Sequence, residues 1–163
     1  ALAATWDDNP RAVARAATLA DAIRARIPLS DTTSAVEIGG GTGLLARALA
    51  GDIGSALVTD VAPGMVETAA EVLAGPRYAG WRTALYDVER DPLLGERFDL
   101  VLCQLALHHM GDVPLICARE LDVVGAKQRC IRVMMHFNSG RTRSELHHVY
   151  LRDARDLRDD LPQ

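Results

Sequence analysis

The residues best suited to chemistry form a glycine-rich segment, Glu37-Ile38-Gly39-Gly40-Gly41-Thr42-Gly43. Glycine adopts positive φ angles without strain and lets a ligand press against the backbone. The first N–H groups of the helix that follows would have no partner within that helix, so they can bind an anionic group. The segment therefore predicts a tight turn from strand to helix that binds a carboxylate or a phosphate.

Two further acidic residues stand where the next two apolar segments end. Asp60 closes Leu57-Val58-Thr59, and a carboxylate there can accept hydrogen bonds from both hydroxyls of a ribose. Asp87 closes Ala84-Leu85-Tyr86 and can accept from the amino group of adenine, while the N–H of Val88 serves a ring nitrogen. The three acidic ends together predict a nucleotide-type ligand.

These residues are positioned by alternating strands and helices. Apolar runs predict strands at 35–38, 56–59, 83–86, 99–105 and 129–137, and helical spacing predicts helices at 10–27, 43–50, 63–73, 112–121 and 141–163. Asn9 and Pro10 are typical of a helix start, and Thr142 with Glu145 fits a capping box. Such alternation predicts an α/β fold whose parallel sheet binds ligands at the carboxyl ends of its strands.

The motifs resemble those of the class I methyltransferases that depend on S-adenosyl-L-methionine (SAM). The pattern E-x-G-x-G-x-G at 37–43, the Asp-x-x-Pro-Gly-Met pattern from Asp60 to Met65, and the fourth strand with its paired histidines occur in the family's order. The resemblance implies SAM as cofactor. It implies cofactor contacts by Glu37, Gly39, Gly40, Gly41, Gly43, Asp60, Val61, Met65, Asp87, Val88 and Gln104.

The resemblance also implies a Rossmann-like, doubly wound αβα sandwich with strand order 3-2-1-4-5. We expect one domain over 1–163, with an N-terminal helix and lid at 1–28, a cofactor-binding core at 34–137 and a C-terminal helix at 141–163. The family pattern fades after Asp122, and no sequence is left for the family's strands six and seven. A truncation, with or without an altered reading frame, and a minimal five-strand variant both account for this.

Loss of those strands would leave the edge of the fifth strand unpaired. Its Ile131, Val133, Met135 and Phe137 would then promote aggregation or a homodimer.

The acceptor side is less well defined by the sequence. The motif at Gln104 lacks the Asn/Asp-Pro-Pro-Tyr of enzymes that methylate amino groups of bases or glutamine, so we expect a small organic acceptor. His108 and His109 either face the cofactor and acceptor or pack as turn residues, and Trp6 either covers the pocket or packs on the surface. No catalytic residue is assigned, because methyl transfer needs mainly proximity and alignment.

Composition and charge disfavour several classes of partner and site. The net charge is −4 and the 18 basic residues are scattered, which disfavours nucleic acid as a partner. No apolar run approaches the ~18 residues of a membrane span and no secretory signal is evident, so we expect a cytoplasmic protein. His136, His147 and His148 lack companions at metal-ligand spacing, and we expect no metal site.

Three functions remain open from the residues. The first is an active methyltransferase for small molecules, and the second is a SAM-binding domain without catalysis. The third is a nicotinamide-dependent oxidoreductase, because Gly41-Thr42-Gly43-x-x-Ala46 also fits a dinucleotide fingerprint. The register of the glycines and Asp87 disfavour the third.

Overall fold

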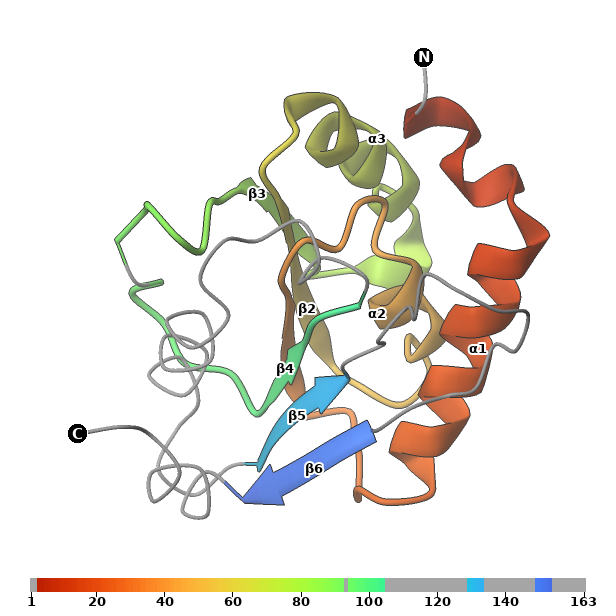
Figure 1. Ribbon diagram of the computed structural model, residues 1–163, viewed down its shortest axis with the longest axis vertical. Coiled ribbons are helices and arrows are strands. Elements are labelled where there is room, and N and C mark those ends of the chain that lie inside the picture. The colour runs from red at the N-terminus through yellow and green to blue at the C-terminus, as the bar shows by residue number, and fades with distance from the viewer. Residues whose placement is uncertain (1–2, 93, 105–128, 134–148, 154–163) are drawn as a thin grey trace, which may run out of the picture.

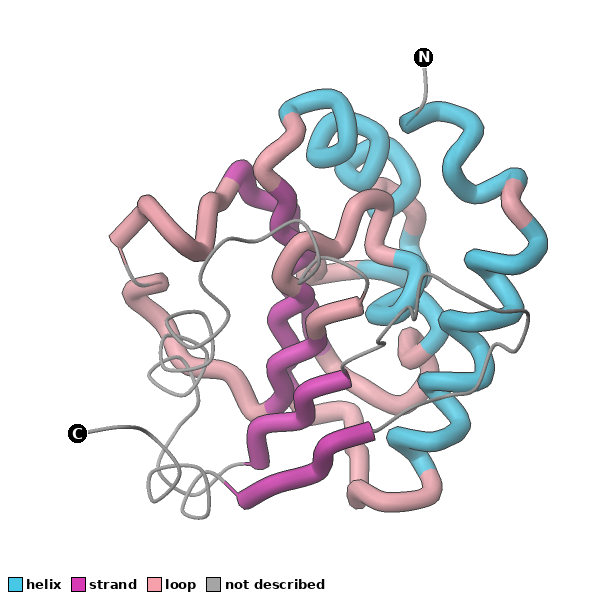
Figure 2. The backbone as a smooth tube through the Cα atoms, viewed as in Figure 1, coloured by secondary structure: helices cyan, strands magenta, loops and turns pink. Residues whose placement is uncertain are grey.

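The computed structural model describes residues 3–92, 94–104, 129–133 and 149–153, and its elements are shown in Figure 1 and Figure 2. The helices are the 3-10 helix η1 (Ala3–Asp8), α1 (Pro10–Arg24), α2 (Leu44–Ala48), α3 (Pro63–Leu73) and the 3-10 helix η2 (Pro76–Tyr78). The strands are β1 (Ser34–Glu37), β2 (Ser55–Asp60), β3 (Arg82–Leu85), β4 (Leu100–Leu102), β5 (Arg129–Val133) and β6 (Val149–Asp153).

The central sheet has the order β3-β2-β1-β4, and all of its strands are parallel. The expected order 3-2-1-4 is confirmed for these strands. In register, Val36 pairs with Leu57 of β2 on one side and with Val101 of β4 on the other. Because the strands are parallel, the segments that follow β1, β2, β3 and β4 all leave the sheet at the same edge.

Local sequence signals set the start of α1. The Asn9 side chain accepts hydrogen bonds from the N–H groups of Arg11 and Ala12, and Pro10 occupies the first helical position, where its missing N–H costs nothing. The predicted helix start is confirmed. Its buried face, which includes Leu19 and Ile23, packs toward α2 and the sheet.

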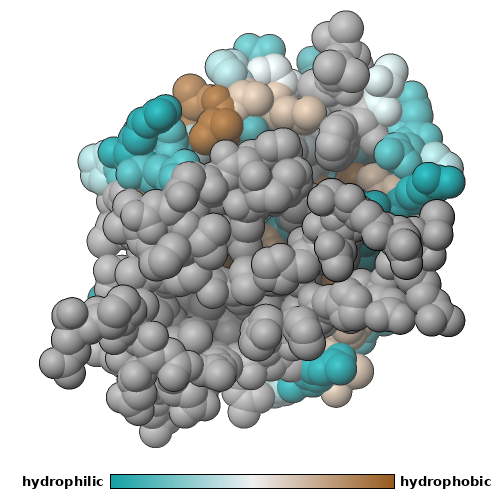
Figure 3. Space-filling model, in the orientation of Figure 1, coloured by the Kyte–Doolittle hydropathy of each residue, from teal (hydrophilic) through white to brown (hydrophobic). Residues whose placement is uncertain are grey.

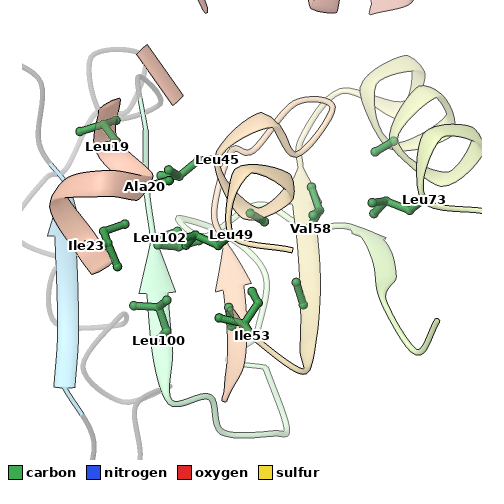
Figure 4. Packing of buried hydrophobic residues seen from close by; sticks show 14 residues of the cluster. Leu19, Ala20, Ile23, Leu45, Leu49, Ile53, Val58, Leu73, Leu100 and Leu102 are labelled. Atoms are coloured by element: carbon green, nitrogen blue, oxygen red, sulfur yellow. The ribbon is translucent and has the colours of Figure 1, made fainter. Parts of the chain in front are cut away.

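Burial on both faces explains why the inner strands are almost continuously apolar. One core cluster lies between the sheet and helices α1, α2 and α3, and alternating strand residues such as Val58, Leu100 and Leu102 point into it (Figure 4). A second cluster lies on the opposite face and contains Val36 and Val101. The helix predicted at 112–121 lies outside the described residues.

The region after β4 differs from the prediction. β5 lies beside β4 in Figure 1 but pairs antiparallel with β6, with Arg129 opposite Asp153 and Val133 opposite Val149. A single helix over 141–163 is therefore wrong at Val149–Asp153, which is a strand. The expectation that the edge of the fifth strand stays unpaired is wrong as well, because β6 occupies it; Met135 and Phe137 lie outside the described residues.

Within the described ranges, no helix combines the length and apolar character that crossing a lipid bilayer requires.

A substitution at Gly54 would test how closely the loop before β2 packs against the loop before β1. A Cβ atom at Gly54 would lie 1.9 Å from the backbone oxygen of Asp31, whereas a Cβ at Gly51, in the same loop, would meet nothing within 4 Å. We expect Gly54→Ala to cost about 1–3 kcal/mol, because backbone cannot rotate away as a side chain can. Thermal unfolding should show a Tm lower by about 2–4 °C per kcal/mol. Gly51→Ala is the control, and equal Tm values for the two variants would contradict this packing.

Candidate cofactor-binding site

The glycine segment forms a tight turn between β1 and α2 that glycine alone adopts easily. Gly39, Gly41 and Gly43 have φ angles of 61°, 58° and 79°, in the left-handed region. The N–H of Gly40 donates to the oxygen of Thr59 at 2.8 Å, and that of Gly43 donates to the oxygen of Gly40 at 2.9 Å. The predicted strand-to-helix turn is confirmed, and its backbone is fixed against β2.

Glu37 lies beneath this turn rather than at its surface. The side chain is 2 % exposed, and its Oε2 accepts a hydrogen bond from the N–H of Ala46 at 2.9 Å. Burial raises the pKa of the Glu37 carboxyl to about 7, although the backbone N–H groups of Ala46 and Leu45 favour the charged form and lower it. The nearby Arg47 lowers this pKa further, and Asp60 raises it.

The position of Glu37 corrects one expectation. We expected a ligand's anionic group to meet the N–H groups at the start of the helix after the glycines. That expectation is wrong for Leu45 and Ala46, because both interact with the protein's own Glu37 carboxylate. Gly40 packs on the same side chain, and a Cβ there would lie 2.8 Å from Cγ of Glu37.

Asp60, at the end of β2, is tied to the glycine turn. Its Oδ2 accepts from the N–H of Gly41 at 2.9 Å, and its Oδ1 accepts from the N–H of Ala62 at 2.9 Å. The carboxylate is half-buried. Each carboxylate oxygen has two lone pairs, so each can accept one further hydrogen bond from a ligand hydroxyl.

Asp87 lies at the same edge of the sheet, after β3. Its Oδ1 accepts from the N–H of Glu89 at 2.9 Å, and its Oδ2 accepts from the Arg90 guanidinium at 3.3 Å. The Val88 side chain is buried in the second core cluster, which leaves only its backbone to face a ligand. Gln104 follows β4 at this edge and is partly exposed.

Apolar side chains flank Asp60. Val61 is 60 % exposed, and Leu85, which is 59 % exposed, pairs with Asp60 across β2 and β3. Met65, in the first turn of α3, is partly exposed. In Figure 3 a compact hydrophobic area lies among hydrophilic residues near β3 and α3. Leu85 was not predicted from the sequence. The signal was present, because β2 and β3 are adjacent and the register of the two strands places Leu85 opposite Asp60.

A second feature that sequence reasoning missed is the contact of Asp7, in η1, with the glycine turn. The Asp7 carboxylate accepts from the hydroxyl of Thr42 and forms an ion pair with the guanidinium of Arg47 in α2. Thr42 is fully buried. Asp7 lies 35 residues from Thr42 in the sequence, so no local pattern indicates this contact.

The candidate acceptor-side residues remain predictions. His108 and His109 lie outside the described residues, and so does the side chain of Trp6. In the part of the chain that the structure describes, no cluster of His, Cys, Asp and Glu has the arrangement of a metal site.

Comparison with protein families gives two matches. The methyltransferase domain family matches residues 35–124, more than half of the chain, and type I chorismate mutase matches residues 102–161. The chorismate mutase AroH of Thermus thermophilus is 43% identical over 58 residues, which are 36% of this chain and 45% of that enzyme. AroH of Bacillus subtilis is 43% identical over 49 residues, 30% of this chain and 39% of the enzyme. The chain thus spans less than half the length of these curated relatives.

Several solved methyltransferase structures are similar to the chain. SAM-bound CalS10, an amino pentose methyltransferase from Micromonospora echinaspora, has a TM-score of 0.58 and 26% identity over 76% of this chain and 51% of its own. NodS, an N-methyltransferase from Bradyrhizobium japonicum solved with S-adenosyl-L-homocysteine, has a TM-score of 0.63 and 21% identity over 77% of this chain and 63% of its own. Both similarities support the Rossmann-like fold of the chain.

The buried Glu37 carboxyl makes stability depend on pH. Its pKa of about 7 lies above the ordinary value of 4.5, so between these pH values the folded protein holds a proton that the unfolded chain has released. The free energy of unfolding should therefore fall as pH rises through this window, by about 3 kcal/mol in all. Glu37→Gln should remove most of this fall.

Urea unfolding between pH 4.5 and 7.5 measures the effect. Glu67→Gln is the control, because Glu67 lies exposed on α3. An unchanged pH slope in Glu37→Gln, matching that of Glu67→Gln, would contradict the assignment.

Proposed function

We propose, from the premise that this chain belongs to the class I SAM-dependent methyltransferase family, that it binds SAM at the carboxyl edge of β1–β4 and transfers the methyl group to a small organic acceptor. The observation that carries the proposal is the position of the Glu37 carboxylate. It occupies the start of α2, where dinucleotide-binding folds hold a pyrophosphate. A pyrophosphate there would face a buried acidic group, whereas SAM has no phosphate.

The donors and acceptors at this edge fit the parts of SAM. The open lone pairs of Asp60 suit the two ribose hydroxyls, and the apolar Val61 and Met65 suit the face of the adenine ring. Asp87 and the backbone of Val88 would accept from and donate to the adenine edge. The glycine turn, in which Gly39 and Gly41 carry no side chain of their own, would let the methionine part approach the backbone closely.

In this proposal SAM supplies the activated methyl group, and the chain supplies position. The backbone turn and Asp60 hold the cofactor in one orientation, so that its methyl group is directed to the acceptor. Gln104, at the end of β4, would line the floor between cofactor and acceptor. His108, His109 and Trp6 are the candidates for the acceptor side, where a neutral imidazole would remove an acceptor proton and an indole would exclude water.

A small organic acceptor is supported by the structural neighbours. CalS10 is described as an amino pentose methyltransferase and NodS as an N-methyltransferase. The alternative is a SAM-binding domain without turnover, since His108 and His109, two candidates for the acceptor side, lie within the match to chorismate mutase.

A second candidate function concerns residues 102–161. Their match to type I chorismate mutase, with 43% identity to two such enzymes, favours an origin of this segment in that family. The antiparallel pair β5–β6 lies inside the matched segment and belongs to a sheet separate from β1–β4. We propose rearrangement of chorismate as the activity to test for this segment.

Asp60 provides the test of cofactor binding. Calorimetry with purified chain should show binding of SAM and of its demethylated product, and no binding of NAD. Asp60→Asn keeps one acceptor for the Gly41 N–H but loses the charge, so SAM should bind about 10–100-fold more weakly, as expected for losing hydrogen bonds to a charged group. Asp31→Asn is the control, because Asp31 is exposed in the loop that precedes β1. Binding of NAD in preference to SAM would overturn the proposal.

Turnover separates the remaining functions. With labelled SAM, we expect methyl transfer to a panel of small amines and hydroxyl compounds and none to DNA, RNA or protein. Binding without transfer to any acceptor would favour the domain without catalysis, and transfer only to macromolecules would contradict the small acceptor. The same preparation incubated with chorismate alone reports on the second candidate, and an unchanged chorismate concentration would exclude that activity.

A further inference from the structure

The N-terminal 3-10 helix η1 is attached to the cofactor loop by one side chain. Figure 1 shows η1, in dark red, at the start of α1 and beside α3. Asp7 extends from η1 to two groups at once, the hydroxyl of Thr42 and the guanidinium of Arg47. Thr42 lies between Gly41 and Gly43, which both have positive φ angles. The contact therefore joins η1, which is distant in sequence, to the part of the turn where the flanking glycines allow the backbone to change conformation.

The contacts of Asp7 lie in a part of the structure that is largely shielded from solvent. Thr42 is fully buried, and the side chains of Asp7 and Arg47 are 29 % and 22 % exposed. Burial alone would lower the pKa of Arg47, but the interactions with Asp7 and the Tyr78 hydroxyl outweigh it and hold that pKa above its ordinary value. Removing Asp7 would leave a buried hydroxyl and a half-buried cation without their shared acceptor, which is costly.

The adjacent acid offers a built-in comparison. Asp8 is exposed, and among the described residues it makes no ion pair. Asp8 is thus a second carboxylate one residue along the chain, and of the two only Asp7 is hydrogen-bonded to the turn. A general effect of negative charge near the cofactor would appear in both, whereas a specific linkage would appear only at Asp7.

We propose that Asp7 is a positioning residue that couples docking of residues 3–8 to cofactor binding by fixing Thr42 and the glycine turn. The proposal rests on the proposed function, since the turn is taken to bind SAM. Coupling between two equilibria is reciprocal. If docking of η1 holds the turn in its binding conformation, then bound cofactor must equally hold η1 in its docked position.

The first part of the test needs no ligand. Hydrogen–deuterium exchange on the free protein should show faster exchange in residues 39–43 and 3–8 for Asp7→Asn than for the wild type and Asp8→Asn. Asp7→Asn conserves the size of the side chain, and unfolding curves establish that it remains folded. Equal exchange in Asp7→Asn and Asp8→Asn would overturn the linkage, whatever the protein binds.

The second part measures the coupling. We expect Asp7→Asn to weaken binding of SAM about tenfold, within the usual range for coupled sites, and Asp8→Asn to leave it unchanged. Added SAM should slow exchange of residues 3–8 in the wild type, and this protection should be lost in Asp7→Asn. A purely structural role would lower stability but change neither the affinity of the folded protein nor the protection.

Arg47→Met is a second variant that removes the same ion pair from the other side. It keeps an extended apolar stem and removes the charge, and it should weaken SAM binding as Asp7→Asn does. The double variant should lose little more than either single one, because the two residues act through one interaction. Additive losses would overturn the coupling. If the folded wild type binds no SAM, the proposed function and the coupling both fail, while the exchange data still decide whether Asp7 fixes the turn.

Discussion

The buried Glu37 carboxylate is the interaction on which the architecture of the site depends. It joins the end of β1 to the backbone at the start of α2, and Gly40 must pack against it without a side chain. A buried carboxylate costs free energy unless it is hydrogen-bonded. The protein meets part of this cost with backbone N–H groups, and the residual cost is visible in a pKa of about 7. If the turn changed its path, the Glu37 carboxyl would be exposed to solvent or would lose its hydrogen bond while still buried.

Residues proposed to bind the cofactor also stabilise the glycine turn. Because Asp60 bonds the N–H of Gly41, the acid that would bind ribose also fixes the turn, and its two oxygens are aimed before a ligand arrives. Asp7 adds a third attachment through Thr42. Three acidic side chains from η1, β1 and β2 therefore hold one short loop from different sides. Such prior alignment reduces the ordering that a ligand must impose on binding.

The sequence predicted what local chemistry determines. Asn9 as a helix cap and the run of glycines required no knowledge of the fold, and both were found in the expected conformation. The Asp7 contact joins segments 35 residues apart and has no local signal. The helix expected over 141–163 rested on a capping pattern and helical spacing. Pairing of Val149–Asp153 with β5 overrides those preferences, since short apolar runs suit both states.

The two family matches overlap at residues 102–124, and this overlap begins at the end of the last described strand of the parallel sheet. β4 ends at Leu102, and the match to chorismate mutase begins at residue 102. The residues proposed to bind SAM, from Glu37 to Gln104, all lie within the methyltransferase match. The candidate acceptor residues His108 and His109 fall where both families match. In the proposed function the residues that bind SAM differ from the candidates at the acceptor side, so cofactor binding and choice of acceptor would be separable.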